Sequence, residues 1–153
     1  MSTITIRQAV LSDLEALAML FDGYRQFYGR ASDLHAAREF LLERFNHDES
    51  VLFIAHEGNN PVGFTQLYPS FSSVSLARIF VLNDLFVYEH ARRKGVASKL
   101  MTAAIDYASF LGAVRVSLST ATTNEAAQRL YQSAGWKRDE QFFVYHFTIP
   151  STL

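Results

Sequence analysis

The second half of this chain alternates strand-like and helix-like segments, and this alternation restricts the possible folds more than any other feature. Ile79–Tyr88 is long and largely apolar, as expected of a buried strand. A segment with apolar residues at helical spacing follows it, and then a second short strand-like run, Val114–Ser119. A strand, a helix and a strand in this order predict a crossover that makes the two strands parallel in one sheet.

The first half predicts antiparallel strands and a pair of helices. Thr3–Ala9 alternates as a strand does, and Val51–Tyr68 holds two apolar runs around a Gly-Asn-Asn-Pro turn, which indicates a hairpin. Apolar stripes at helical spacing begin near Ser12 and Asp33, which are both suitable caps. The aromatic run Gln141–Thr148 predicts a final strand. The whole pattern predicts an α/β fold with a mixed sheet.

Length, charge and cysteine content narrow the classes of function. The 153 residues fit one domain, which we expect to span 1–153. The 14 basic and 15 acidic residues give no strong field toward nucleic acid or anionic lipid. The lack of cysteine excludes disulfides, thiolate zinc sites and a Cys nucleophile, and the five histidines show no ligand spacing, so we expect no metal. Without a signal peptide or a membrane-length apolar run, we expect a cytoplasmic protein that does not bind membranes.

A basic, glycine-containing loop lies between Ile79–Tyr88 and the helix after it. Amides in the first turn of a helix have no partners within the helix and lie at the positive end of its dipole. A glycine there lets an anion approach the backbone, which predicts a pyrophosphate site. An exposed basic helix start is an equally good interpretation of the loop alone. The spacing fits neither a Walker loop nor the dinucleotide fingerprint. The loop and first turn contain Arg92, Arg93, Lys94, Gly95, Val96, Ala97 and Ser98.

A second motif, Asn124–Trp136, places a tyrosine beside the apolar face of a predicted helix. Ala127, Leu130 and Ala134 fall on one side of that helix. Tyr131 lies next to this stripe, so its ring can be buried while its hydroxyl points into a cleft. The sequence alone favours a structural core tyrosine but leaves a reactive one open.

The polar pair Asn83 and Asp84 interrupts the apolar run Ile79–Tyr88. Successive residues of a strand face opposite sides of the sheet, so the two side chains should diverge. A carboxylate in such surroundings is costly unless it is paired or hydrogen-bonded, and burial raises its pKa. Asp84 is therefore either a proton acceptor or a structural residue that bonds a nearby loop or helix end.

Together these features resemble the GNAT superfamily of acetyl-CoA-dependent N-acetyltransferases. The hallmark of that family is Arg/Gln-x-x-Gly-x-Gly/Ala at the start of a helix, matched here by Arg92, Gly95 and Ala97. Its second motif places Asn, Ala, Leu-Tyr and Gly-Phe at the spacing found in Asn124–Trp136. The resemblance runs from Val62 to the final strand. It implies a GNAT fold of about six to seven strands and about four helices, with splayed parallel strands that bind the coenzyme.

The resemblance also implies roles for individual residues. Acetyl-CoA would be the co-substrate, with its pantetheine against the free backbone of Leu85 and Val87 and its pyrophosphate at the glycine loop. A backbone amide near Phe86 could polarise the thioester carbonyl, and Tyr131 would protonate the leaving thiolate. The coenzyme-binding residues implied are Leu85, Phe86, Val87, Arg92, Arg93, Lys94, Gly95, Val96, Ala97, Ser98 and Asn124.

Leu82–Val87 looks most like members that acetylate polyamines or histone-type lysines. Spermidine/spermine-type enzymes carry a Glu-Asp pair here, with the Glu proposed as the base. Asn83 occupies that Glu position and cannot be a base, so Asp84, a water or the solvent would take the proton. Residues that could line an acceptor site are Tyr24, Tyr28, Tyr68, Phe71 and Asn83. The first two also continue a helical stripe and can simply be core residues.

The sequence thus predicts an N-acetyltransferase that works by direct attack of a primary amine in a ternary complex. Polyamine, protein lysine, amino sugar and amino acid all remain possible acceptors. A non-catalytic acyl-CoA-binding sensor would keep the glycine loop but would need neither Tyr131 nor a base, so their presence favours an enzyme. Small acetyltransferases of this kind often pair through C-terminal strands, and the resemblance therefore implies a homodimer.

Overall fold

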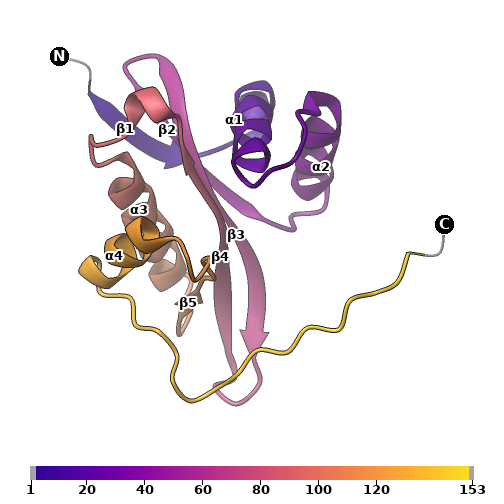
Figure 1. Ribbon diagram of the computed structural model, residues 1–153, viewed down its shortest axis with the longest axis vertical. Coiled ribbons are helices and arrows are strands. Elements are labelled where there is room, and N and C mark those ends of the chain that lie inside the picture. Colours follow the sequence, from indigo (N-terminus) through magenta and orange to yellow (C-terminus); the bar gives the residue numbers. More distant parts are fainter. Residues whose placement is uncertain (1–2, 152–153) are drawn as a thin grey trace. The chain divides into compact units, whose positions relative to one another are not determined.

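The structure is a computed structural model that describes residues 3–151, and it consists of two units. The first unit ends at Ser119 and the second begins at Thr120. The first contains a sheet with strand order β1-β2-β3-β4-β5 together with helices α1, α2 and α3, and the second contains helix α4 (Figure 1). The predicted mixed α/β fold is confirmed, with five strands and four α-helices among the described residues.

The first four strands form an antiparallel sheet, and the last strand joins it in parallel. The hairpin predicted from the Gly-Asn-Asn-Pro turn is confirmed, and Gly58 takes the left-handed conformation (φ +59°) that this tight turn requires. The strands are β1 (Ile4–Gln8), β2 (Val51–Glu57), β3 (Asn60–Ser72), β4 (Ala77–Val87) and β5 (Val116–Ser117).

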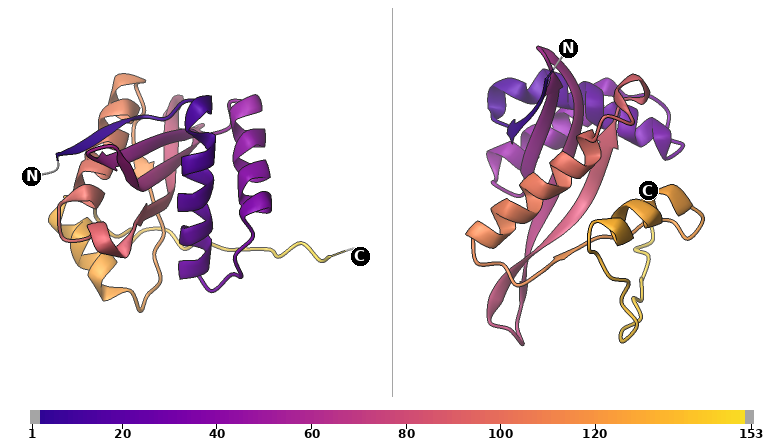
Figure 2. Two further views of the ribbon diagram at one scale, coloured as in Figure 1. Left: turned by 90° about the horizontal axis from the view of Figure 1, so that it is seen from above. Right: turned by 90° about the vertical axis from the view of Figure 1, so that its left-hand side faces the viewer.

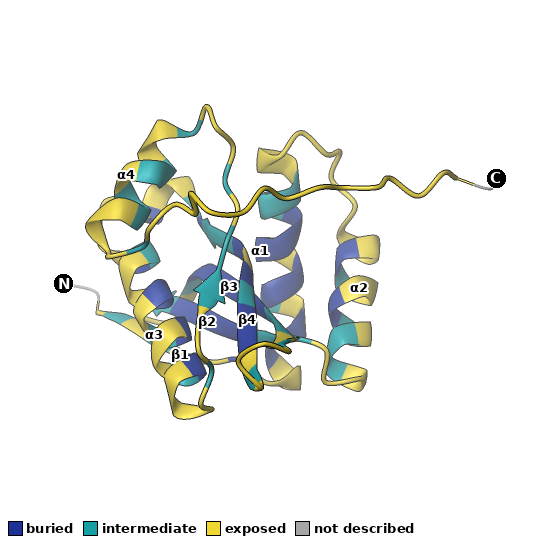
Figure 3. Cartoon of the chain, turned by 90° about the horizontal axis from the view of Figure 1, so that it is seen from below, coloured by how far each residue is buried: buried dark blue, intermediate teal, exposed yellow. Residues whose placement is uncertain are grey.

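Helices cover both faces of the sheet. The helix α1 lies on one face with α2 packed beside it, and α3 lies on the other face (Figures 1 and 2). Leu17 of α1 and Leu100 of α3 are fully buried, and buried residues gather on the sheet and on the helix sides that face it (Figure 3). No helix within residues 3–151 is long and apolar enough to cross a bilayer. The helices are α1 (Leu14–Phe27), α2 (Leu34–Asn46), α3 (Val96–Phe110) and α4 (Glu125–Ser133).

The start of α1 differs from the sequence prediction, because Asp13 organises it rather than Ser12. A short 3-10 turn, Leu11–Asp13, precedes the helix. The Asp13 carboxylate accepts a hydrogen bond from the Val10 amide at 2.8 Å and is bound by both terminal nitrogens of Arg7 at 2.7 Å. A bidentate charged pair is stronger than a hydroxyl cap, which explains why the aspartate takes this role.

Two predicted strands are shorter than expected or absent. The segment predicted as Val114–Ser119 forms a strand only at Val116–Ser117. The segment predicted as Gln141–Thr148 contains no strand, so the expected count of about six to seven strands is corrected to five in the described chain. Phe142 and Phe143 are adjacent, so apolar residues fall on both faces, and the pattern does not define a partner for pairing. A strand needs such a partner for its backbone groups, and the Phe143 side chain is 90% exposed.

Candidate active site

A β-bulge at Asn83 interrupts the pairing of β3 with β4. Gln66 is paired with Asp84 and Leu67 with Leu82, which leaves Asn83 as an extra residue on β4. One extra residue breaks the alternation of a strand, so that the side chains after it change face.

The change of face is visible in the aromatic contacts of β4. Before the bulge, the ring of Phe80 contacts Tyr107 of α3, with centroids 5.9 Å apart. After the bulge, the ring of Phe86 contacts Tyr24 of α1, on the opposite face, at 6.4 Å. Simple alternation would put these two phenylalanines on the same face. The bulge therefore turns Asp84 toward α1 and away from α3.

Asp84 is the most enclosed carboxylate of this region, with 2% of its surface exposed. Its carboxylate accepts hydrogen bonds from the side-chain amides of Gln66 and Asn83, the latter at 2.9 Å. Burial raises its pKa above the ordinary value, and these neutral donors only partly offset that effect. Among the described residues no cation forms a salt bridge with it, so this carboxyl is a candidate for proton transfer.

Three of the predicted acceptor-site tyrosines lie in one cluster around Asp84. The hydroxyl of Tyr24 donates to the carbonyl oxygen of Asn83 at 3.1 Å, and its ring contacts that of Tyr28 at 5.0 Å. Burial, followed by the negative charge of Asp84, raises the pKa of Tyr68 to about 12. The ring of Tyr24 also packs on the core residues Phe64 and Phe86, so the ring is structural, and the hydroxyl proton is used in the bond to Asn83.

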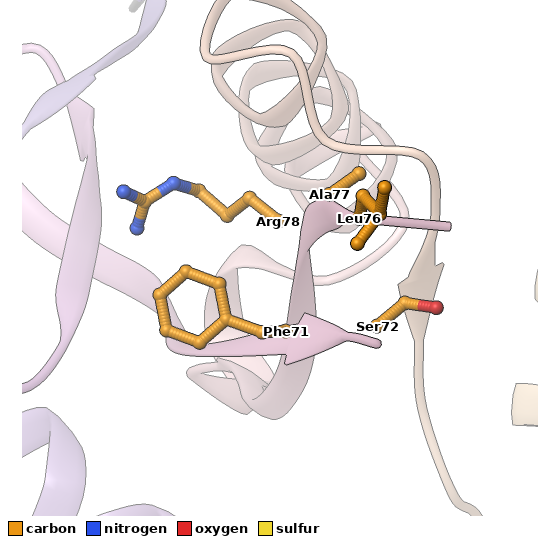
Figure 4. Close-up of a pocket in the computed structure, with 5 residues that line it drawn as sticks. All are labelled: Phe71, Ser72, Leu76, Ala77 and Arg78. Atoms are coloured by element: carbon orange, nitrogen blue, oxygen red, sulfur yellow. The ribbon is translucent and has the colours of Figure 1, made fainter. Parts of the chain in front are cut away.

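Phe71, in contrast, lies away from this cluster. It is paired with Arg78 near the tip of the β3–β4 hairpin, five positions beyond Gln66, which is about 16 Å along a strand. An open hollow of about 380 Å³ is formed there by Phe71, Ser72, Leu76, Ala77 and Arg78 (Figure 4). The guanidinium of Arg78 lies 5.3 Å from the Phe71 ring centroid. This arrangement gives Phe71 a local packing partner and no contact with Asp84.

The outer edge of β4 beyond the bulge is open in the first unit. The ladder between β4 and β5 includes only Phe80 and Val81. The amide of Tyr88 donates to the carbonyl oxygen of Val62 in β3. In an antiparallel pair every second residue bonds the neighbouring strand, so the residues in between, Leu85 and Val87, direct their backbone groups away from β3. The carbonyl of Val87 accepts from Arg92, so the amide of Val87 and the backbone groups of Leu85 are what this edge offers to an extended ligand, as predicted for pantetheine.

The basic side chains of the glycine loop have partners within the fold. The Nε atom of Arg92 donates to the carbonyl oxygen of Val87 at 3.1 Å, and its guanidinium lies 5.8 Å from the ring centroid of Phe27. Lys94 forms an ion pair with Glu57 at 2.7 Å. Backbone amides rather than these two side chains are therefore the main candidates for binding an anion.

The backbone at the start of α3 has the geometry of an anion site. Gly95 is left-handed (φ +76°), and a Cβ added to it would meet no atom within 4 Å, so the space beside it is open. The first bond within the helix runs from the amide of Lys99 to the carbonyl of Gly95. The amides of Val96, Ala97 and Ser98 precede that bond and have no acceptor inside the helix. These residues fit a pyrophosphate.

The second unit contains the other two predicted functional residues. The side-chain oxygen of Asn124 accepts a hydrogen bond from the amide of Ala127 at 3.1 Å, so it caps α4. Tyr131 lies near the end of α4, where its ring centroid is 6.1 Å from that of Trp136 and its carbonyl accepts from the Trp136 amide. The Asn-to-Trp motif thus builds a capped helix with an aromatic pair at its end.

Sequence reasoning missed Gln66. This side chain is completely buried, its nitrogen donates to Asp84, and its oxygen has no hydrogen-bond partner. The available signal was the polar pair Thr65 and Gln66 within the otherwise apolar strand that precedes β4. A polar residue on a buried strand calls for a polar partner on the next strand, and Asp84 supplies it.

Comparison with known proteins agrees with this geometry. The chain is 49% identical over 148 residues to the uncharacterized N-acetyltransferase YhfO of Bacillus subtilis, covering 97% of this chain and 99% of that protein. A probable acetyltransferase of Haemophilus influenzae is 36% identical over 141 residues, with 90% and 92% covered. The crystal structure of a probable acetyltransferase superimposes with a TM-score of 0.90 at 44% identity, covering 96% of this chain and 99% of the other.

The family assignment rests on most of the chain. Residues 17–136 match the acetyltransferase (GNAT) family, a range that includes the β4 bulge, the glycine loop and the Asn-to-Trp motif. The expectation drawn from those two motifs is thereby confirmed, and this chain belongs to the GNAT family of acetyl-CoA-dependent N-acetyltransferases.

Proposed function

We propose that this protein transfers the acetyl group of acetyl-CoA directly to a cationic primary amine of the polyamine or lysine type. The observation that carries the proposal is Asp84, an enclosed carboxyl that forms no salt bridge with a cation in residues 3–151, held beside a cluster of tyrosines. Aromatic faces with a carboxylate suit an alkylammonium. The proposal includes a single domain over 1–153 that acts as a homodimer in the cytoplasm.

Acetyl-CoA would bind along the open edge of β4 and at the start of α3. Leu85 and Val87 offer backbone groups to the pantetheine, and the amides from Arg93 to Ser98 offer donors to the pyrophosphate. Asn124 keeps its amide nitrogen for the coenzyme, since only its oxygen is used in capping. When bound, the coenzyme supplies an acetyl thioester for attack.

An alkylammonium must lose a proton before its nitrogen can attack a thioester. Asp84 is the proposed final acceptor of that proton. The amide of Phe86 or a neighbouring residue would stabilise the developing oxyanion. Tyr131 is the proposed acid that gives a proton to the leaving thiolate. No acyl-enzyme is involved, because the chain has no cysteine and no activated serine motif.

The experiment is thiol release from acetyl-CoA with a panel of polyamines, lysine peptides, amino sugars and amino acids. The protein contains no cysteine, so a thiol reagent reports only coenzyme A. Release that depends on polyamines or lysine peptides supports the proposal. Release with another class alone would reassign the acceptor. Binding of acetyl-CoA without release for any amine would favour the sensor alternative.

Tyr131→Phe separates the acid role from a structural one. We expect lower turnover with nearly unchanged binding of acetyl-CoA, measured by calorimetry. Unchanged turnover would exclude Tyr131 as the acid.

A further inference from the structure

Asn83 is the exposed member of the polar pair on β4. It is the extra residue of the bulge, and it is exposed, whereas only 2% of the surface of Asp84 is exposed. The ladder between β4 and β5 ends at Val81, so Asn83 lies where the outer edge of β4 opens. A ligand at this point of the edge therefore meets the side chain of Asn83 before that of Asp84.

The side-chain amide of Asn83 is held in one orientation. Its nitrogen donates a hydrogen bond to the Asp84 carboxylate at 2.9 Å. An ionised carboxylate only accepts hydrogen bonds, so the amide nitrogen must face it and the amide oxygen must point elsewhere. Within residues 3–151 that oxygen accepts no hydrogen bond. The buried carboxylate thus orients a free acceptor on an exposed residue.

The backbone of Asn83 is anchored as well. The Tyr24 hydroxyl donates its proton to the Asn83 carbonyl oxygen at 3.1 Å. The Tyr24 ring is itself packed, with centroids 5.0 Å from Tyr28 and 5.9 Å from Phe64. Anchors at the backbone and at the amide nitrogen fix the side-chain oxygen in advance, so that a ligand does not have to order it on binding.

The acyl end of a bound coenzyme would come to Asn83. The Arg92 side chain donates to the Val87 carbonyl, which places the glycine loop at the Val87 end of the open edge. With the pyrophosphate at this loop, an extended arm runs back along β4 past Leu85. Asn83 lies four positions before Val87, which is about 13 Å along a strand. The thioester and the attacking amine then meet at the bulge.

We infer that the side-chain oxygen of Asn83 binds the attacking amine by accepting one of its N–H groups, and that Asp84 orients this oxygen. This role rests on the proposed function, and it makes Asn83 a catalytic residue. An ammonium has three N–H bonds. One of them stays intact and points at Asn83, while another loses its proton to give the lone pair that attacks the thioester carbon. Asn83 gains and loses no proton, as its amide chemistry requires.

The contact can be tested by binding, without acetyl transfer. The probes are Nα-acetyl-lysine methylamide and its Nε-trimethyl analogue, which carries the same charge but no N–H group on the side-chain nitrogen. Calorimetry in the presence of coenzyme A gives a Kd for each. The wild type should bind the primary amine about 10- to 100-fold more tightly, as expected for one hydrogen bond from a charged group. In Asn83→Leu, which is similar in size but has no acceptor, this preference should be lost.

Two further variants separate this contact from an indirect effect through Asp84. Gln66→Met removes the other amide that donates to Asp84, but Gln66 is completely buried and cannot touch the amine, so the preference should remain. Asn83→Asp keeps a side-chain oxygen at the same position, so it should also keep the preference.

The outcomes distinguish this inference from the proposed function. Equal binding of the two probes by the wild type, an undiminished preference in Asn83→Leu, or an equal loss in Gln66→Met would overturn the role of Asn83 alone. Acetyl transfer by the wild type to no amine of the panel would overturn the proposed function.

Discussion

Asp13 at the start of α1 and Asp84 at the bulge of β4 are both enclosed carboxylates, yet their surroundings are opposite. Asp13 is 9% exposed and forms a bidentate pair with Arg7. The Arg7 guanidinium lowers the pKa of Asp13, whereas burial raises the pKa of Asp84, which has no such cation. The first carboxylate stabilises the fold in its charged form, and the second is the proton acceptor of the proposed function.

A third carboxylate, Asp22 of α1, refines this contrast. Burial raises its pKa, but hydrogen bonds from the Ser32 hydroxyl and the Asp33 amide lower it, and the balance is a lowered value. The positive charge of Arg25 lowers it as well, so hydrogen bonds and a nearby cation together offset burial at the edge of the core. Asp84 lies deeper, and the amides that donate to it do not offset the effect of burial on its pKa. Depth and the lack of a cation together distinguish Asp84.

The largest expected effect is on catalysis by Asp84→Asn. The change removes the proton acceptor while keeping size and hydrogen bonds, because Gln66 can turn its free oxygen toward the new amide. We expect kcat to fall about 10²- to 10⁴-fold with an amine from the panel. Asp13→Asn, the same chemical change at the other carboxylate, should leave the rate per folded molecule unaltered. An equal fall in kcat in both variants would contradict the idea that only Asp84 takes part in proton transfer.

The next largest effect is on stability, where substitution of Asp13 should matter more than substitution of Asp84. Asp13→Asn loses the charged pair with Arg7, which is half exposed, so we expect a loss of about 1–2 kcal/mol in the free energy of unfolding. The melting temperature should fall by about 2–8 °C for a chain of this length. In an Arg7→Gln background the same substitution should cost less. An undiminished cost there would mean that the Val10 amide, not Arg7, accounts for the effect.

A smaller effect of opposite sign is expected for Asp84→Asn. Removing a buried charge without a cationic partner should increase the free energy of unfolding by about 1 kcal/mol. Urea denaturation would measure this gain. Asp84→Ala is the control, because it leaves a cavity and strands the donors of Gln66 and Asn83, so it should destabilise. A lower free energy of unfolding in Asp84→Asn would show that the Asp84 carboxylate stabilises the fold.

The sequence identified the candidate residues of this site better than it predicted their geometry. The glycine loop and the Asn83-Asp84 pair are local patterns, so both were recognisable, and the α/β order was confirmed from periodicity alone. The bulge was not recognisable, because nothing in the residues around Asn83 fixes the register between β3 and β4. Strict alternation therefore gave no reason to place Phe80 and Phe86 on opposite faces.

The partners of the basic side chains could not be predicted from the sequence either. We expected Arg92 and Lys94 to add charge at the pyrophosphate, and in the structure Arg92 donates to the carbonyl of Val87 while Lys94 pairs with Glu57, which is 37 residues away. The final strand failed for a related reason, since whether an aromatic run pairs depends on a partner edge rather than on its own residues.

The smallest effect is on how the free energy of unfolding depends on pH, where Asp13 and Asp84 should contribute with opposite signs. The pKa of Asp13 is lower in the folded state than its ordinary 3.8, so its stabilisation is complete above that value and is lost as the pH falls through the folded pKa. The pKa of Asp84 is higher in the folded state, so its destabilisation is complete at neutral pH and fades as the pH falls toward 3.8.

The difference in the free energy of unfolding between wild type and Asp84→Asn should therefore close in mildly acidic solution. The gap to Asp13→Asn, of opposite sign, should close only in stronger acid. Urea unfolding at intervals from pH 7 to pH 3 measures both gaps, and simultaneous closure would mean that the two carboxylates share one kind of environment.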